Sequence, residues 1–289
     1  MSNILLLVPS SLAAFGVSRG SGAENLLRPD PREIWLDSAV GSAVTIDMDL
    51  GVATSIDTVF LGCLYSASQD ATWTITGGVA AYDELTLKAA GDLRVPERAG
   101  RVSHFSHAFW HGDDVLVRYV RISITQPAGA SPLGIGVLMI GSAFVPEFNQ
   151  VWGSGRAVKD TGSVTRLPSG GIAVVEGARY GSYKWSLEDL SNDEIDLLYE
   201  IQLDRGETRR VLVVEDPDQT PGLRNRIHYG LLTGLRPSSR KSATQGQWEL
   251  AIEDWVSESD AVVLQLPTPA MTLGGTPISF GGEILTIGA

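Results

Sequence analysis

Residues 43–50 read AVTIDMDL, and the spacing of their apolar residues indicates the fold class of the chain. Its apolar residues stand at every second position from Val44 onward, and a period of two predicts a half-buried β-strand. We expect Gly51 to close this strand. Further strands in the first half are predicted at residues 56–64, 71–76, 85–88, 102–110, 115–125 and 136–144. The first half is therefore expected to be an all-β domain.

One of these strands changes phase. Val115, Val117 and Tyr119 share one side of an extended chain, whereas Val120 and the alternate residues after it share the other. A regular strand cannot bury both sets on one side of a sheet. We therefore predict a β-bulge near Tyr119.

The composition suits two β-rich domains. The chain has 289 residues, of which 43% are apolar and 19% charged, and its 32 glycines and 14 prolines indicate many tight turns. The net charge of −12 opposes nucleic-acid binding, which needs a positive surface to neutralise phosphates. We interpret the acidity as a source of solubility for a protein made in many copies.

The single cysteine and the apolar N-terminal residues indicate folding in a reducing cytoplasm. Cys63 lies in an apolar run and is expected to be a buried thiol, with no second cysteine for a disulfide. Residues 4–8 (ILLLV) are too few to span a bilayer, and they lack the preceding basic residues of a signal peptide. We expect a first β-strand there.

The pattern after about residue 155 predicts a second unit with one helix. Ser191 and Glu194 form a capping-box pattern that predicts a helix over 192–204, and Gly206 is expected to stop it. Strands are predicted at residues 155–159, 161–166, 172–176, 179–187, 210–215, 227–235 and 247–255.

The last residues differ from both units. Residues 264–289 are apolar, nearly uncharged and interrupted by Pro and Gly, and their short β-capable pieces cannot build a core alone. They could form an arm that adds strands to a neighbouring subunit. Alternatively, they could pack along their own domain.

Several stretches of the first half resemble a known family. The stretch VTIDMDLG at 44–51, SIDTVFLG at 55–62, VRYVRISIT at 117–125 and GIGVLMIGSAF at 134–144 are similar to the N-terminal region of certain phage minor tail proteins. That region is similar to galactose-binding-like (discoidin-type) jelly-roll domains. The resemblance covers roughly residues 24–144, and it implies a jelly-roll domain over residues 1–148.

The second half resembles a different unit. Residues 156–214, with SLEDLSNDEIDLLYEI at 186–201 and RGETRRVLVV at 205–214, are similar to the β-sandwich-plus-helix unit of phage tail-tube and distal tail proteins. This likeness implies such a β-sandwich over residues 149–260, followed by an extended arm over 261–289. The expected fold class is mainly β, with a jelly-roll β-sandwich and a C-terminal β-sandwich that carries one α-helix.

Candidate carbohydrate-binding residues come from loops at one end of the expected jelly roll. In ligand-binding domains of this type, such loops supply polar and aromatic contacts to a sugar. Trp35, Asp37, Tyr65 and Trp110 lie in or beside three expected loops, and an exposed aromatic ring could stack on a sugar. The simpler interpretation is that a tryptophan fills the end of the core.

No residue pattern indicates a catalytic or metal site. His104, His107 and His111 could bind zinc only if three or four donors converged on the ion, and along a strand His104 and His107 would face opposite sides. Asp47 and Asp49 lie on the solvent face of one strand, without the apolar pocket that an acid–base pair needs. The nucleophile-elbow, phosphate-loop and zinc-protease motifs do not occur. We expect no enzyme activity, no metal and no cofactor.

These expectations lead to a structural function. The resemblance implies a component of a phage tail tip or baseplate, made in the host cytoplasm and located in the virion tail. Its expected partners are further copies in a sixfold or threefold ring, tail-tube and tail-hub proteins, and a host surface glycan bound by the first domain. No membrane is expected, and no nucleic-acid contact beyond passage through the lumen. The alternative is a carbohydrate-binding module of a cell-surface protein.

Overall fold

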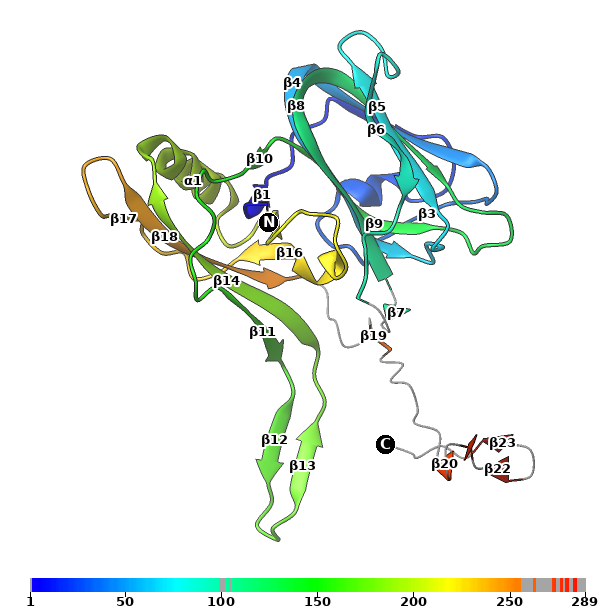
Figure 1. Ribbon diagram of the computed structural model, residues 1–289, viewed down its shortest axis with the longest axis vertical. Coiled ribbons are helices and arrows are strands. Elements are labelled where there is room, and N and C mark those ends of the chain that lie inside the picture. Colours follow the sequence, from blue (N-terminus) through cyan, green and yellow to red (C-terminus); the bar gives the residue numbers. More distant parts are fainter. Residues whose placement is uncertain are drawn as a thin grey trace.

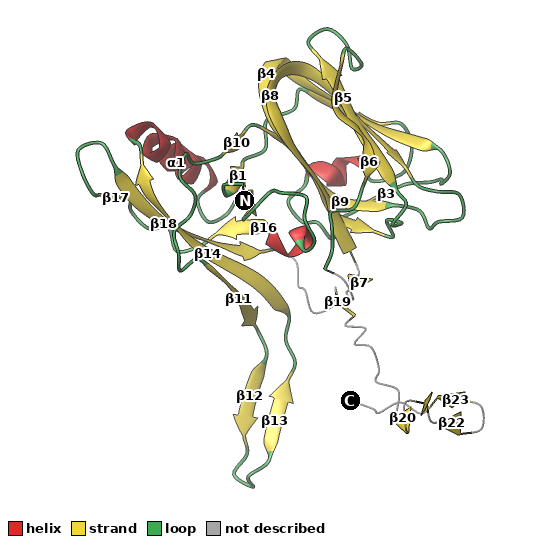
Figure 2. Ribbon diagram, viewed as in Figure 1, coloured by secondary structure: helices red, strands yellow, loops and turns green. Residues whose placement is uncertain are grey.

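The computed structural model describes residues 2–98, 102–103 and 105–255, and beyond these only the two-residue strands β19 to β23. Two large sheets, of seven and eight strands, dominate the described part, and Figure 1 shows them as neighbouring bodies. Figure 2 shows that helices form only a small part of the molecule. The expectation of a mainly β fold with one α-helix is confirmed.

The first sheet forms the jelly roll and has the order β3-β9-β4-β8-β5-β6, with β2 paired to β4. All of its pairings are antiparallel. Its strands are β2 (Ala14–Val17), β3 (Trp35–Leu36), β4 (Ala43–Tyr65), β5 (Thr72–Gly78), β6 (Leu85–Asp92), β8 (Phe105–Thr125) and β9 (Gly134–Gly141), and a short 3-10 helix covers Ala23–Leu27.

Strands β4 and β8 are longer than predicted. The sequence predicts a break at Gly51 and a loop near residues 107–114, but β4 runs for 23 residues and β8 for 21. Gly51 has a φ of +82° and lies in the register shift between the Asp49–Tyr119 and Thr54–Val117 pairs. It therefore bends β4 without ending it. An irregularity next to Tyr119 is present, but its extra residues are on β4 and not on β8, the strand in which the bulge is predicted.

The jelly-roll core takes residues from both halves of the long strands. Val44 and Ile46 from the first half of β4 and Val59 from its second half belong to one buried cluster. Ile122 and Ile124 of β8 belong to the same cluster and have no exposed surface. The predicted strand phase after Tyr119 is confirmed.

The second sheet has the order β10-β1-β15-β16-β18-β14-β11, with β17 paired to β18. The predicted helix is α1 (Asn192–Arg205), with the Ser191–Glu194 capping box and with Gly206 at its C-terminus. Leu198 of α1 packs against this sheet. The strands are β1 (Leu5–Leu7), β10 (Ala143–Phe144), β11 (Gly155–Asp160), β14 (Arg179–Leu190), β15 (Arg210–Val214), β16 (Ile227–Leu232), β17 (Ser239–Arg240) and β18 (Gly246–Asp254), and a 3-10 helix covers Leu223–Arg226.

The first strand of the chain belongs to the second sheet. Leu6 of β1 pairs with Val213 of β15 on one side and with Phe144 of β10 on the other. The chain thus begins in the second sheet, passes through the jelly roll and returns. The structure differs here from the expected division at residue 148, because residues 1–148 include strands that complete the other domain.

A buried apolar layer joins the two domains. It contains Leu5, Leu7, Phe60, Val95, Phe109, Val137, Met139, Leu212, Val214, Leu223, Ile227 and Tyr229. Strand β9 lies between this layer and the jelly-roll core, and all of its residues are buried. A strand that is covered on both faces reads as a continuous apolar run rather than an alternating one, which explains the sequence GIGVLMIG.

The remaining strands are short. β12 (Ser163–Arg166) pairs with β13 (Ile172–Val175), and β7 (Val102–Ser103) pairs with β19 (Val262–Val263). β20 (Thr272–Leu273) pairs with β21 (Thr276–Pro277), and β22 (Ser279–Phe280) pairs with β23 (Glu283–Ile284). Most of the expected arm over 261–289 lies outside the described residues. In the described part, no helix has the length and apolar character to cross a membrane.

Candidate functional site

Trp35 and Asp37 hold the jelly roll together and leave no surface for a sugar. The Trp35 side chain is fully buried, and its Nε1 donates to the carbonyl oxygen of Arg19 at 3.2 Å. Asp37 is 3% exposed and accepts two hydrogen bonds from the Arg19 guanidinium, at 2.6 and 3.0 Å. The interpretation of Trp35 as a plug at the end of the core is the one that the structure supports.

Tyr65 and Trp110 are half-buried and lie at different ends of strand β9. Tyr65 pairs with Gly134 at the start of β9, and burial raises the pKa of its hydroxyl to about 12. Trp110 belongs to β8 rather than to a loop, and it pairs with Val59, which pairs with Ile140 near the end of β9. The four candidate residues therefore do not form one site.

The histidines near the start of β8 have structural roles. His107 is 6% exposed, and its Nδ1 accepts a hydrogen bond from the backbone N–H of Cys63 at 3.1 Å. Burial, followed by the charges of Arg224 and His228, holds the pKa of His107 well below its usual value. His104, the third histidine of the candidate zinc set, lies outside the described residues. Within the described ranges, no group of three His, Cys, Asp or Glu side chains could hold a metal.

A row of contacting aromatic and guanidinium side chains, called here the Tyr82–Tyr119 stack, lies on the outer face of the jelly roll, with the two rings tilted by 59° to each other. The Arg118 guanidinium lies 4.8 Å from the centroid of the Tyr119 ring, which lies 5.2 Å from that of Tyr82. The Arg121 guanidinium lies 4.9 Å from the Tyr82 centroid. Cations above aromatic rings are stabilised by the ring quadrupole. The row thus combines two rings and two fixed positive charges on one surface.

Two carboxylates hold these arginines. Asp49 accepts from Arg118 at 2.8 and 3.0 Å, and Asp47 accepts from Arg121 at 2.7 and 2.8 Å. Bidentate pairs of this kind fix the guanidinium plane. The sequence does not reveal the stack, because Tyr82 lies in a turn with no distinguishing pattern. The aspartates were placed correctly on the solvent face of their strand.

The β12–β13 hairpin extends away from both sheets (Figure 1). It carries large apolar side chains in solvent: Val164 is 69% exposed, Ile172 58% and Val174 62%. At its base, the Thr161 N–H donates to the Ala178 carbonyl oxygen at 3.0 Å. The hairpin is therefore a projection whose two strands are hydrogen-bonded to each other at the base.

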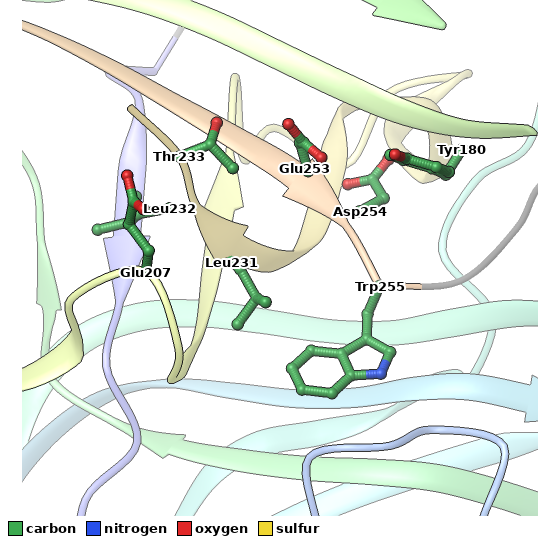
Figure 3. A pocket seen from close by; sticks show the side chains of 8 residues that line it. All are labelled: Tyr180, Glu207, Leu231, Leu232, Thr233, Glu253, Asp254 and Trp255. Carbon is green, nitrogen blue, oxygen red and sulfur yellow. The ribbon is translucent and has the colours of Figure 1, made fainter. Parts of the chain in front are cut away.

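A depression of about 370 Å³, called here the sheet trough, lies on the second sheet near the ends of β16 and β18. Its walls are formed by Tyr180, Glu207, Leu231, Leu232, Thr233, Glu253, Asp254 and Trp255. Figure 3 shows the Trp255 indole on one side and the Glu253 and Asp254 carboxylates on the other, with Glu207 at the end opposite Tyr180. The trough therefore combines an apolar wall with acidic groups.

A buried histidine neutralises part of this acidity. His228 Nδ1 lies 3.1 Å from Asp254 Oδ1, and its Nε2 lies 2.8 Å from Glu215 Oε1. Burial alone would lower the pKa of His228, but the hydrogen bonds and charges of Asp254 and Glu215 raise it to about 9. The ring is therefore protonated at neutral pH. Glu253 pairs with Lys159, so among the described residues Glu207 is the trough carboxylate without an ion pair.

Comparison with known proteins finds similarity only in fold. No family model matches the sequence, and no curated protein is similar to it. Among solved structures, CpGH89CBM32-6 produced by Clostridium perfringens is 13% identical, with 45% of this chain and 92% of that chain covered and a TM-score of 0.35. A chitosan-binding module from a Paenibacillus chitosanase/glucanase is also 13% identical, with 46% and 98% covered and a TM-score of 0.35.

A third similar structure is a protein in complex with a DNA polymerase domain. Reduced XRCC1 bound to the DNA polymerase β catalytic domain is 20% identical, with 47% of this chain and 99% of that chain covered and a TM-score of 0.36. Unrelated functions occur on one fold, and likeness of this degree assigns no ligand. Each of these three likenesses covers slightly less than half of this chain.

Proposed function

We propose that the chain is a non-enzymatic structural subunit that assembles with further copies of itself through the β12–β13 hairpin. The observation that carries this proposal is the exposure of Val164, Ile172 and Val174 on a two-stranded projection. An isolated two-stranded hairpin is at best marginally stable in water. Clustered exposed apolar side chains are typical of protein interaction sites. Burial of the hairpin against another copy would stabilise its two strands and remove its apolar side chains from water.

The assembly that we propose is a phage tail tip or baseplate, in which copies form a ring near the distal end of the tail. The resemblance of residues 156–214 to tail-tube and distal tail units supports this setting, together with the single helix and the projecting hairpin. Tail-tube and tail-hub proteins would be its neighbours, and the jelly roll would face outward from the ring.

The hairpin offers a matched test because its two faces differ. Light scattering of the full chain would follow the average mass with concentration. The double change Val164→Asp and Val174→Asp should keep the protein monomeric, because it places two charges on the apolar face. Ser163→Asp, on the other face, should assemble like the wild type. Equal masses for all three proteins would refute the proposal.

A second candidate function is glycan binding by the first domain. The observation that favours it is the Tyr82–Tyr119 stack, since aromatic faces beside fixed Asp and Arg groups offer stacking and hydrogen bonds to sugar hydroxyls. A glycan array should then show binding that Tyr82→Ala abolishes and that Tyr199→Ala, the same change at an exposed tyrosine of α1, leaves unchanged. An array with no glycan bound by the wild type would reject this candidate.

A further inference from the structure

We infer that the tip of the hairpin of one copy docks in the sheet trough of a second copy, with Arg166 paired to Glu207. This inference rests on the proposed self-assembly, and it names the surface that receives the hairpin. The two surfaces lie on different parts of the chain, and both combine apolar side chains with charges, which are positive on the hairpin and negative in the trough.

The hairpin presents one apolar face that ends in a positive charge. Val164 pairs with Val174, and Arg166 pairs with Ile172. Residues directly opposite in an antiparallel pair point to the same side, and alternate pairs share that side. These four side chains therefore form a single face. The other face carries Ser163, Thr165, Ala173 and Val175, which are smaller or more polar on average.

The trough offers matching groups. Leu231 and the Trp255 indole supply an apolar wall for the valines and for Ile172. Glu207 is exposed, and one of its oxygens accepts a hydrogen bond from the N–H of Leu235 at 3.1 Å. Among the described residues, neither Glu207 nor Arg166 belongs to an ion pair. Each therefore retains its charge for a partner.

The charge of the chain favours this pairing over other contacts. Copies that each carry a net charge of −12 repel one another at most surfaces. A cationic tip that enters an acidic trough is a local exception, and it would fix the orientation of the hairpin.

The geometry of such a contact determines the kind of assembly. The hairpin and the trough are different surfaces of one chain, so each copy would offer a free hairpin and a free trough to its neighbours. Contacts of this head-to-tail type form a ring when the rotation between copies closes and a filament when it does not. A closed symmetric dimer would not result unless both contacts formed at once.

Charge reversal with rescue tests the docking. In sedimentation of the full chain, Arg166→Glu and Glu207→Arg should each raise the concentration needed for half-assembly by about tenfold, equivalent to about 1.4 kcal/mol. The double variant should return to within about threefold of the wild type, since it restores an ion pair with exchanged charges. Arg240→Glu, which makes the same charge change on an exposed arginine outside both surfaces, should behave as the wild type.

The outcomes separate this inference from the proposed function. A wild type that stays monomeric at all concentrations overturns both. Assembly that Val164→Asp with Val174→Asp abolishes but Arg166→Glu and Glu207→Arg leave intact overturns only the docking site. The inference is also overturned if removal of residues 268–289 prevents assembly while neither charge reversal affects it. The hairpin and the trough would then not bind each other. Loss in the single variants with rescue in the double supports it.

Discussion

Leu6 lies between Val213 and Phe144 in the second sheet, so the start of the chain completes a domain whose other strands come much later. This pairing ties the start of the chain to the second sheet. Leu5 and Leu7, on the opposite face of the same strand, belong to the apolar layer between the domains. The strand thus contributes to two buried clusters at once.

Disruption of β1 should therefore destabilise the whole chain. Leu6 is 4% exposed, and Leu6→Asp would bury an unpaired charge at a cost of several kcal/mol. Val52→Asp changes an exposed residue of β4 and should stay within about 0.5 kcal/mol of the wild type. Urea unfolding of both variants gives the comparison. A Leu6→Asp protein with wild-type stability would show that β1 is dispensable.

The phase of β8 can be tested inside the jelly roll. Ile122 has no exposed surface and lies between Ile46 of β4 and Ile75 of β5. Ile122→Asp should cost several kcal/mol, whereas Ser123→Asp on the outer face should be nearly silent. Thermal melts followed by circular dichroism measure the difference. Equal losses would contradict the assigned strand phase.

The contact between β16 and β18 depends on a glycine. A Cβ at Gly230 would lie 1.7 Å from the carbonyl oxygen of Glu253, and backbone cannot move aside as a flexible side chain can. Gly230→Ala should cost more than about 2 kcal/mol in unfolding free energy. Gly155→Ala, where no atom lies within 4 Å, is the control. Similar melting temperatures for the two variants would show that β16 and β18 can move apart to accommodate the Cβ at little cost.

The buried His228 predicts a dependence of stability on alkaline pH. Its pKa is raised to about 9 in the folded chain, so its contribution to stability is complete below about pH 6.5, its unfolded pKa. The contribution is lost as the pH rises toward 9, by a few kcal/mol at most. Urea unfolding between pH 6 and pH 10 should show this decline in the wild type. His228→Gln should flatten it, and an unchanged slope in that variant would refute the assignment.

Much of the fold could be predicted from local patterns. The capping box of Ser191 and Glu194 located α1, because it satisfies exposed amides wherever a helix begins. Alternation located the strands of both sheets, since one face of each is buried. The continuity of β4 through Gly51 could not be predicted, because a glycine at positive φ suits a bulge as well as a turn. The position of β1 depends on pairing with distant residues that no local pattern reveals.

The candidate site was harder to predict. Trp35 and Asp37 have residue types that suit sugar binding, but their burial follows from contacts with Arg19 that the sequence does not indicate. The exposure of Val164 and Ile172 was equally hidden, because the same alternation describes a strand inside a sheet and a strand in a free hairpin. Side-chain type alone does not say which face of a strand is left uncovered.

Assembly through the β12–β13 hairpin can be tested by shortening that hairpin. Thr161 and Ala178 are hydrogen-bonded at its base, so residues 162–177 can be replaced by an Asn-Gly turn that suits a two-residue hairpin. Sedimentation velocity should show a concentration-dependent assembly for the full chain and a monomer for the shortened protein, with nearly equal melting temperatures. Assembly of the shortened protein at the same concentration as the full chain, or a full chain that remains monomeric, would show that the hairpin does not mediate assembly.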